Sequence, residues 1–386
     1  MRVLHITSGN MYGGVETFLT TLLRERSSAP DMQPEFAVCF EGRFSSELEM
    51  LGHIPNRLAP ARLSRPLTVL RARRALSELL QRETYDVIVC HQPWTCVLLA
   101  SAIRAAGFPL VLWVHMANDG RHWLERLCRF TRPDVAFCSS RFVATNTACW
   151  LPDALIEHVY YPVSPSSLAA RSGADRKQVR ADLQTSVSDV VIAQVSRLES
   201  WKGQHVLLSA LAMLRDVPGW TCWVVGGPQR RSETRYLATL KRLAQTSGIE
   251  ERVRFLGERR DVAAVLGAAD LFCQPNTMPE PFGLSLVEAQ QCGLPVVTTG
   301  VGGALEIVDG TCGVLIAPND MNALAAALRR LVFDQNLRAR LSAASRRRAE
   351  DVWNAARQIG QVEAALKRAM AVRPEMQPRP VEAGLR

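Results

Sequence analysis

Short apolar runs that alternate with segments of helical spacing most limit what this chain can fold into. Most of these runs are apolar on both faces, with no regular alternation of apolar and polar residues. Strands buried on both faces are typical of parallel sheets covered by helices. The runs lie at residues 3–7, 35–40, 86–91, 110–115, 135–140 and 158–163, and at residues 190–196, 221–227, 253–257, 271–276, 295–300 and 313–317.

This pattern predicts an α/β protein with two Rossmann-like domains, each built on a doubly wound parallel sheet. The 386 residues suffice for two domains with separate cores. A Pro/Ser-rich stretch near residue 163 predicts an N-terminal domain at 1–163 and a second domain at 164–352. We expect a final helix at 353–371 to pack back toward the N-terminal domain, and a disordered tail at 372–386.

The spacing of the cysteines and the length of the apolar runs indicate the cellular compartment. The ten cysteines form no C-x-x-C pair, and most lie in apolar runs, so we expect buried reduced thiols rather than disulfides or a zinc site. The first apolar run reads as a strand and is too short for a signal peptide. No run approaches the roughly 20 residues of a membrane-spanning helix. The sequence therefore predicts a cytoplasmic protein.

Glycines and cations follow two of the predicted strands, and open α/β sheets bind ligands at the carboxyl ends of their strands. Gly13 and Gly14 precede a helix expected to start near residue 15, where backbone N–H groups can bind phosphate; a tight turn without a ligand explains the pair equally well. Arg197 and Lys202 follow the run at 190–196 and could neutralise one diphosphate. The alternative is a solvated pair of loop cations.

The segment at 276–295 carries two carboxylates near a helix terminus. We expect Pro281 to open the helix and Gly293 to end it. Glu280 then lies in the preceding loop and Glu288 inside the helix, where carboxylates can accept hydrogen bonds from sugar or ribose hydroxyls. The alternatives are dipole complementarity for Glu280 and a surface salt bridge for Glu288.

Taken together, these motifs resemble the retaining GT-B glycosyltransferases of family 4, over nearly the whole chain. GT-B enzymes have two Rossmann-like domains that face each other across a cleft. The matching pieces are Gly13-Gly14-Val15-Glu16, Ser196-Arg197-Leu198 with Lys202-Gly203, the Gly226-Gly227-Pro228 turn, Phe255-Leu256-Gly257 with Arg260-Asp261-Val262, the Glu280/Glu288 pair, Cys292-Gly293-Leu294-Pro295, Gly302-Gly303 with Glu306-Ile307-Val308, and Trp353.

The resemblance implies a role for each matching residue. Arg197 and Lys202 would hold the diphosphate of a nucleotide-sugar donor, and Glu288 would bind its ribose. Glu280, with the backbone of Phe282, Gly283 and Leu284, would bind the donor sugar, while Gly13 and Gly14 would close over the phosphates. His115 would lie near the reacting sugar and His91 on the acceptor side; without the resemblance, a satisfied histidine at a strand end is the simpler interpretation of His115.

Two departures concern the hinge and the nucleotide pocket. The family often has Asn-Gly after the last strand of the first domain, where this chain has Tyr161-Pro162. The Gly226-Gly227 turn lacks the acidic residue that the family commonly has there. These departures leave the identity of the donor open.

The predicted activity is retaining, metal-independent hexosyl transfer from a UDP- or GDP-sugar to a glycan, lipid-linked or small-molecule hydroxyl, as in polysaccharide or glycolipid synthesis. No cofactor is expected, and the chain has no Asp-x-Asp motif of the metal-dependent type. A nucleotide-sugar epimerase and a non-catalytic nucleotide-sugar or glycan binder are the alternatives. Nucleic-acid binding is disfavoured because only 6% of residues are aromatic and the arginines are not interleaved with them.

The net charge of +9 includes one dense stretch of arginines without an acidic residue. Its members are Arg57, Arg62, Arg65, Arg71, Arg73 and Arg74. We expect this stretch to be a surface for an anionic membrane or a lipid-diphosphate acceptor, which would make the protein peripheral at the inner membrane face. A solvated helix face explains it equally well.

Overall fold

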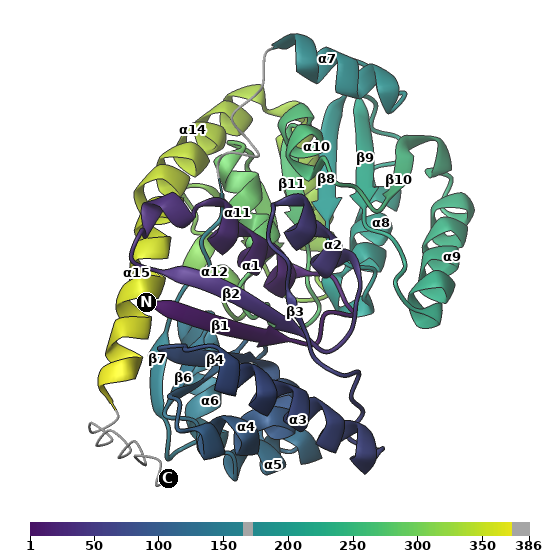
Figure 1. Ribbon diagram of the computed structural model, residues 1–386. Helices are drawn as coiled ribbons and strands as arrows, with labels where there is room; N and C mark the ends of the chain where they lie inside the picture. Colours follow the sequence, from purple (N-terminus) through teal and green to yellow (C-terminus); the bar gives the residue numbers. More distant parts are fainter. Residues whose placement is uncertain (165–172, 373–386) are drawn as a thin grey trace, which may run out of the picture.

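The computed structural model describes residues 1–164 and 173–372, which form two parallel sheets flanked by helices (Figure 1). The N-terminal sheet has the strand order β3-β2-β1-β4-β5-β6-β7, and the C-terminal sheet has the order β10-β9-β8-β11-β12-β13. All neighbouring strands in these two sheets pair in parallel. The α/β fold predicted from the buried apolar runs is confirmed.

The strands of the first sheet are β1 (Arg2–Thr7), β2 (Gln33–Val38), β3 (Asn56–Arg57), β4 (Val87–His91), β5 (Leu110–Val114), β6 (Val135–Cys138) and β7 (Leu155–His158). Those of the second are β8 (Val190–Val195), β9 (Trp220–Val225), β10 (Val253–Gly257), β11 (Leu271–Gln274), β12 (Val296–Thr299) and β13 (Gly313–Ile316).

The helices of the first domain are α1 (Gly14–Arg24), α2 (Arg43–Met50), α3 (Pro66–Arg82), α4 (Gln92–Ala106), α5 (Trp123–Arg129) and α6 (Arg141–Trp150). Those that follow are α7 (Gly173–Asp182), α8 (Gln204–Ala212), α9 (Arg231–Thr246), α10 (Val262–Ala268), α11 (Leu284–Gln291), α12 (Ala304–Ile307), α13 (Met321–Phe333), α14 (Gln335–Val352) and α15 (Ala355–Ala371). Three short 3₁₀ helices are η1 (Arg26–Ser28), η2 (Ser200–Lys202) and η3 (Glu250–Arg252).

The expected strand at 158–163 is wrong, because the strand lies at Leu155–His158 and only its last residue overlaps the prediction. This strand is an edge strand that pairs with β6 alone, and none of its residues is fully buried. The apolar residues that suggested a strand come after it, where Tyr160 and Tyr161 turn toward the second domain and pack against Phe282. The short β3 was not expected from the sequence.

One hydrophobic cluster runs through both domains. It joins Phe18 and Trp113 of the first domain to Phe272 and Phe282 of the second. Each of these side chains is at most 2% exposed, so the two domains share a buried apolar contact beside the cleft.

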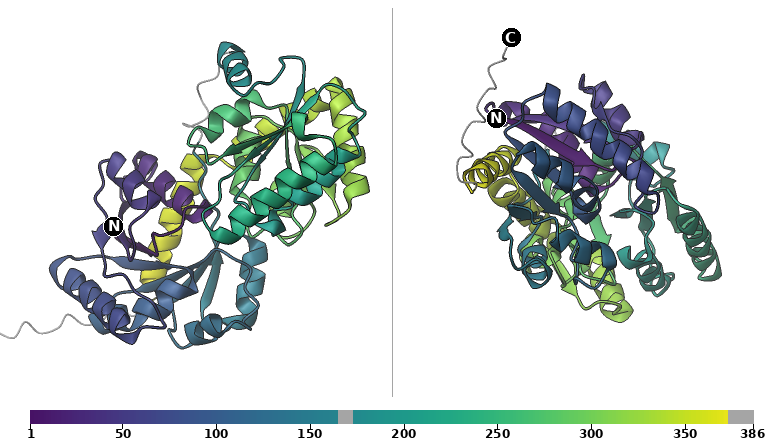
Figure 2. Two further views of the ribbon diagram at one scale, coloured as in Figure 1. Left: turned by 90° about the vertical axis from the view of Figure 1, so that its right-hand side faces the viewer. Right: turned by 60° about the horizontal axis from the view of Figure 1, so that its bottom comes forward.

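The C-terminal helix α15 returns to the first domain, as Figure 2 shows by the yellow helix lying against the N-terminal lobe. It contacts η1 and β4. Lys367 Nζ lies 3.2 Å from Asp31 Oδ2, and Arg368 pairs with Glu157. Apart from Val372, the tail predicted at 372–386 lies outside the described residues.

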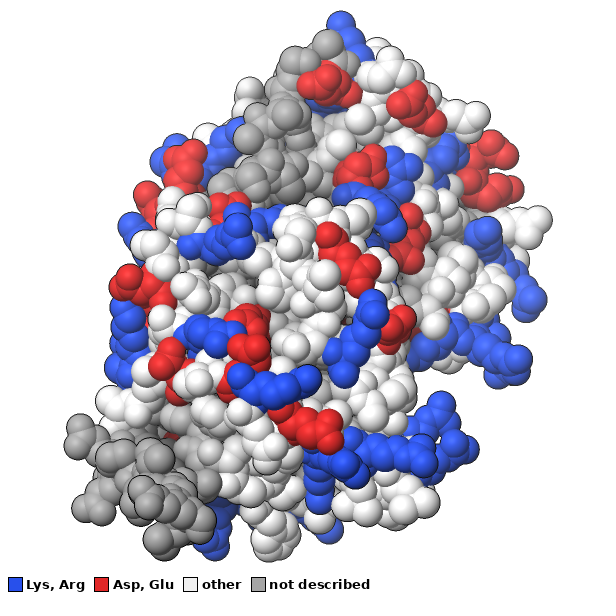
Figure 3. All heavy atoms as spheres, viewed as in Figure 1, with Lys and Arg blue, Asp and Glu red and all other residues white. Residues whose placement is uncertain are grey.

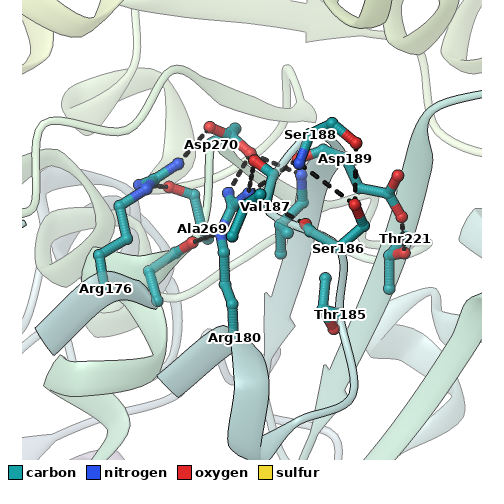
Figure 4. A network of polar contacts seen from close by, with 12 residues as sticks. Arg176, Arg180, Thr185, Ser186, Val187, Ser188, Asp189, Thr221, Ala269 and Asp270 are labelled. Carbon is teal, nitrogen blue, oxygen red and sulfur yellow. Dashed lines mark hydrogen bonds and ion pairs between the residues drawn. The ribbon is translucent and has the colours of Figure 1, made fainter. Parts of the chain in front are cut away.

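Helix α7 is anchored to the second domain by a polar network (Figure 4). Arg180, only 3% exposed, donates to Asp270 Oδ2 at 2.6 Å, and Arg176 donates to Asp270 Oδ1 at 2.5 Å. Asp270 Oδ2 also accepts the backbone N–H of Val191 at the start of β8. The network therefore fixes α7, the first described element after residue 164, to the end of the second sheet opposite the cleft.

Candidate active site

A cleft of about 1350 Å³ lies between the two domains, and both sheets point their carboxyl ends into it. All eleven residues singled out above line it: Gly13, Gly14, His91 and His115 from the first domain, and Arg197, Lys202, Glu280, Phe282, Gly283, Leu284 and Glu288 from the second. The structure therefore brings these eleven residues together, although they are far apart along the chain.

Arg197 follows β8, and two carboxylates hold its guanidinium group. Its Nη2 donates to Glu233 Oε1 at 3.0 Å and lies 3.1 Å from Glu199 Oε1. Its Nε is buried and has no hydrogen-bond partner among the described residues. A buried, unpaired N–H costs free energy unless a ligand supplies an acceptor. The two carboxylates thus hold the guanidinium in place beside the cleft.

Lys202 ends the short helix η2, and its ammonium group has two partners. Its Nζ lies 2.7 Å from Glu280 Oε2 and 4.0 Å from the centre of the Trp201 ring. The side chain is 15% exposed. An ammonium over an indole face is attracted by the ring quadrupole, so Trp201 helps to direct Lys202 into the cleft.

Glu280 is held through one of its two carboxylate oxygens. Oε2 accepts from Lys202 Nζ, from Gln274 Nε2 at 2.9 Å and from Asn276 Nδ2 at 2.6 Å. The other oxygen, Oε1, has no partner within residues 1–164 and 173–372. The orientation of the carboxylate is therefore fixed, and one acceptor remains for a ligand hydroxyl.

The loop before α11 is pinned to its surroundings, and Pro281 does not open the helix as expected. The helix begins at Leu284, directly after Gly283 with a φ of 110°. Glu280 forms a parallel bridge with Gly302, and the carbonyl of Pro281 accepts from Ser140 Oγ of the first domain at 2.5 Å. These contacts fix the bend at Pro281 and Phe282, and the helix starts only after it, at Leu284.

Glu288 lies in the second turn of α11 and is half-buried. The surface salt bridge considered from the sequence is absent from the described part of the chain. Burial raises the pKa of this carboxyl to about 7, because the charged form is poorly solvated there. A hydroxyl-bearing ligand would supply the hydrogen bonds that the carboxylate lacks.

Across the cleft, Gly13 and Gly14 lead into α1. The backbone N–H of Gly13 donates to Glu16 Oε2 at 2.9 Å. Glu16 is 7% exposed, and burial raises its pKa to about 7. A Cβ at Gly14 would lie 3.1 Å from Leu284 Cδ1 of the opposite domain. The absence of side chains therefore lets the two domains approach closely at this point.

His115 is buried, and both of its ring nitrogens are occupied. Nε2 lies 2.9 Å from His91 Nδ1, and Nδ1 is hydrogen-bonded to the hydroxyl of Tyr161. His91 Nε2 lies in turn 3.0 Å from His5 Nδ1. In this arrangement the histidine is part of an internal network.

Sequence reasoning missed the side chains that hold the predicted residues in place. Gln274 and Asn276 orient Glu280, Glu233 orients Arg197, and Tyr161 binds His115. Gln274 and Asn276 stand at the carboxyl end of β11, where polar residues could have drawn notice. Glu233 lies on another element, and no local pattern links it to Arg197.

Three further features of the structure concern possible metal ligands, membrane-spanning helices and the cysteines. Within residues 1–164 and 173–372, no three His, Cys, Asp or Glu side chains are grouped so that they could hold a metal ion. The helices described there include none that is both long and apolar enough to cross a bilayer. All ten cysteines are free, and eight are buried, so the expected burial of most thiols is confirmed.

Two parallel sheets facing across a cleft with cations and carboxylates at their carboxyl ends define the GT-B class. Two solved structures share this fold over nearly the whole chain. Anabaena Alr3699/HepE, solved in complex with UDP and glucose, superposes with a TM-score of 0.83 at 25% identity, over 95% of this chain and 99% of its own. WaaG, a glycosyltransferase involved in lipopolysaccharide biosynthesis, has a TM-score of 0.71 at 18% identity, over 94% and 99%, which shows the fold alone.

Comparison with protein families and relatives identifies the group. Residues 175–348 match the family "Glycosyl transferases group 1", and residues 12–167 match "Glycosyltransferase Family 4". The chain is 32% identical, over 299 residues, to the GDP-mannose-dependent monoacylated alpha-(1-6)-phosphatidylinositol monomannoside mannosyltransferase of Corynebacterium glutamicum, covering 72% of this chain and 76% of that protein. It belongs to the family 4, group 1 glycosyltransferases.

Another relative matches over a shorter stretch. The D-inositol 3-phosphate glycosyltransferase of Mycobacterium marinum is 40% identical over 160 residues. That match spans 40% of this chain and only a third of the length of the relative.

Proposed function

We propose that this protein transfers a hexose, with retention of anomeric configuration, from a UDP- or GDP-sugar to a hydroxyl of a glycan, lipid-linked or small-molecule acceptor. The observation that carries the proposal is the convergence of Arg197 and Lys202 in the cleft, opposite Gly13 and Gly14. Two cations facing a glycine-lined helix start suit a diphosphate, since N–H groups and positive charge both favour it.

The chemistry follows from where charge develops. The bond between the anomeric carbon and the diphosphate oxygen breaks, and the acceptor oxygen bonds to that carbon on the same face. The acceptor proton passes to the departing phosphate. The Arg197 guanidinium and Lys202 Nζ stabilise the growing negative charge on the leaving group, so the step needs no metal ion.

The remaining donor contacts follow from the carboxylates. Glu280 Oε1 accepts hydrogen bonds from the sugar, and the backbone N–H groups at 282–284 donate to it. Glu288 accepts hydrogen bonds from the ribose hydroxyls. HepE was solved with UDP and glucose, and the Corynebacterium relative is GDP-mannose-dependent. These two proteins support a nucleoside-diphosphate hexose without choosing between the two bases.

In this proposal the acceptor binds to the first domain. The six arginines expected to form one cationic surface there do not all remain unpaired. Arg57 pairs with Glu41 and Glu49, and Arg74 pairs with Glu78. Arg73 donates to backbone carbonyls of α4. The charges of Arg57 and Arg74 are therefore compensated by carboxylates, whereas Arg73 keeps its charge and is tied to α4.

The other three arginines of the stretch support a membrane or lipid-linked acceptor. Arg62, Arg65 and Arg71 are exposed and form no ion pair in the described part of the chain, and Arg62 also lines the cleft. Leu67 and Leu70 beside them are 71% and 59% exposed. Figure 3 shows cationic side chains gathered at the lower right, over the start of α3 and the loop before it. Apolar and basic groups together suit an anionic lipid surface, so the protein would act at the inner face of the membrane.

A panel of donors tests the proposal. The melting temperatures of wild type and Arg197→Ala are measured with UDP-, GDP-, ADP- and dTDP-sugars. We expect the sugars of one nucleotide to raise the melting temperature of wild type but not that of Arg197→Ala. Arg215→Ala, which removes an exposed arginine outside the cleft, is the matched control and should respond like wild type. The proposal would be contradicted if none of the nucleotide-sugars raised the melting temperature of wild type, or if the same one raised that of Arg197→Ala equally.

The same samples separate the alternatives. Incubation with donor alone that yields an epimer would indicate an epimerase, and donor binding without transfer to any acceptor would indicate a non-catalytic binder. Co-sedimentation with vesicles of increasing anionic lipid content tests whether the protein binds to a membrane. Removing Arg62, Arg65 and Arg71 should abolish the lipid dependence, while removing the exposed Arg329, Arg340 and Arg347 should leave it unchanged.

A further inference from the structure

The first turn of helix α6 in the first domain is bound by a carboxylate of the second domain. The backbone N–H of Arg141 donates to Glu306 Oε2 at 3.1 Å, and that of Phe142 donates to Glu306 Oε1 at 3.0 Å. The hydroxyl of Tyr160 also donates to Oε2, at 2.7 Å. The first N–H groups of a helix have no partner inside it, and negative charge is favoured at that end. Glu306 is therefore held by three donors of the other domain.

Ser140, the residue before α6, forms a second link between the domains. Its Oγ accepts the N–H of Val143 at 3.1 Å, which caps the helix, and donates to the carbonyl oxygen of Pro281 at 2.5 Å. The side chain is fully buried. A hydroxyl has a single proton, and here that proton goes to the loop that carries Glu280. The start of α6 thus contacts the second domain at two places.

These two places are connected to each other within the second domain. Glu306 lies on α12, which begins directly after Gly302 and Gly303. Gly302 forms the parallel bridge with Glu280, and the N–H of Gly303 donates to the carbonyl of Glu280 at 2.7 Å. A Cβ would lie 2.5 Å from the Glu280 carbonyl oxygen at Gly302, and 2.6 Å from that of Pro281 at Gly303. Backbone packs on backbone there, so a displacement of α12 would displace the loop at 280–281.

The Glu280 side chain and the loop that carries it are held by different domains. The carboxylate is oriented by Lys202, Gln274 and Asn276, which all belong to the second domain. The contacts at the start of α6 set where the loop lies relative to the first domain. In the proposed function, the donor sugar beside this loop must meet an acceptor bound to the first domain. A misplacement of about 1 Å between reacting groups can slow a reaction about a hundredfold.

We propose that Glu306 and Ser140 are positioning residues, through which the start of α6 fixes the loop at 280–281 against the first domain so that the donor sugar faces the acceptor. Glu306 belongs to the motif Gly302-Gly303 with Glu306-Ile307-Val308, for which the resemblance implied no role. The inference rests on the proposed transferase function for its effect on turnover, whereas the contact between the domains stands independently of that function.

Amide hydrogen exchange tests the contact without any substrate. The N–H groups of Arg141 and Phe142 start a helix, so their protection depends on Glu306. We expect Glu306→Gln to speed exchange at these two amides at least about tenfold in overlapping peptides, because the charge is lost and the amide nitrogen of Gln cannot accept. Equal exchange in Glu306→Gln and wild type would overturn the contact.

Glu35→Gln is the matched control for this experiment. Glu35 is a half-buried carboxylate that lies outside the cleft and accepts from Arg2 and from the hydroxyl of Tyr85. Its replacement should leave exchange at Arg141 and Phe142 unchanged. Faster exchange at these amides in both variants would mean that general destabilisation is the cause, and would overturn the role of Glu306.

Steady-state kinetics and calorimetry test the effect on turnover, well below the melting temperature of each variant. In Glu306→Gln we expect kcat to fall at least about tenfold. The Kd of the donor should change by less than about twofold, because every partner of the Glu280 carboxylate remains. Glu35→Gln should change neither quantity. An unchanged kcat in Glu306→Gln, or an equal loss in the control, would show that Glu306 does not position the loop.

Ser140→Ala gives a second measurement, which also serves if Glu306→Gln does not fold. Its control is Asp334→Ala, which removes the cap of α14 outside the cleft. We expect kcat to fall in Ser140→Ala but not in the control, and the two effects on kcat in Ser140→Ala/Glu306→Gln to be less than multiplicative, since both act on one loop. Multiplicative effects would contradict the shared role. If wild type neither binds nucleotide-sugars nor transfers sugar, the proposed function fails, while amide exchange still decides whether Glu306 holds α6.

Discussion

Lys202 Nζ lies 2.7 Å from Glu280 Oε2, although the two residues are 78 positions apart in the chain. They follow β8 and β11, which are neighbours in the second sheet. Both side chains are largely buried, at 15% and 6% exposed. Each charge thus compensates the other inside the cleft before any ligand binds, and Glu280 Oε1 has no partner among the residues that the structure describes.

Replacing Lys202 by Met should weaken donor binding by at least about tenfold, because a diphosphate loses one of its two cations. It should also lower the free energy of unfolding by about 1–3 kcal/mol, since Glu280 keeps only its two amide donors. Calorimetric titration and urea unfolding measure the two effects. Lys241→Met, on the exposed side of α9, is the control and should change neither. Unchanged donor affinity in Lys202→Met would refute the diphosphate role.

Gly14→Ala should slow turnover with little loss of stability. The new methyl would lie 3.1 Å from Leu284 Cδ1, which is tighter than ordinary contact, and would push the start of α11 away from α1. Gly360→Ala is the control, because Gly360 lies inside a helix and a methyl group there would meet no atom within 4 Å. The control should raise the free energy of unfolding by about 0.5–1 kcal/mol and leave kcat unchanged. Equal kcat in Gly14→Ala and wild type would show that close approach at this point is unnecessary.

The stability contributed by Glu288 should depend on pH. Its pKa is raised from 4.5 to about 7 in the folded state, so the folded protein holds this proton more tightly than the unfolded chain does. Its contribution is complete below pH 4.5 and is lost as pH rises through 7. Relative to wild type, Glu288→Gln should therefore gain stability between pH 5 and pH 8 in urea unfolding. Glu16 has a similarly raised pKa and is present in both proteins, so its effect cancels. A difference that stays constant with pH would contradict the raised pKa.

Asp270→Asn should lower the free energy of unfolding by about 3 kcal/mol, because Arg180 would remain buried without its carboxylate. Asp216→Asn alters an exposed pair whose carboxylate is 92% exposed, and it should have almost no effect. Urea unfolding followed by circular dichroism compares the two. Equal midpoints would mean that backbone carbonyls alone satisfy Arg180.

The sequence correctly located most strands, because a run of buried apolar residues is a local property of the chain. It failed at residues 158–163, where apolar residues pack between the domains instead of extending the sheet. It also failed at Pro281, where contacts with Gly302 and Ser140 hold a bend before the helix. In both places contacts from distant segments outweigh the local preference. Roles assigned to the cleft residues remain predictions, but their convergence is established by the structure.

The sequence by itself determined that two parallel sheets form and that glycines, cations and carboxylates follow their strands. Strand periodicity and chain order suffice for that, since parallel strands deliver their carboxyl ends to one edge. Only the tertiary structure decided which partners each group has. It paired Lys202 with Glu280, left Arg197 Nε without a partner among the described residues, and bonded both ring nitrogens of His115 to His91 and Tyr161. The physical reason is that a hydrogen-bond partner is chosen by atoms within about 3 Å, and here those atoms come from segments far apart in the sequence.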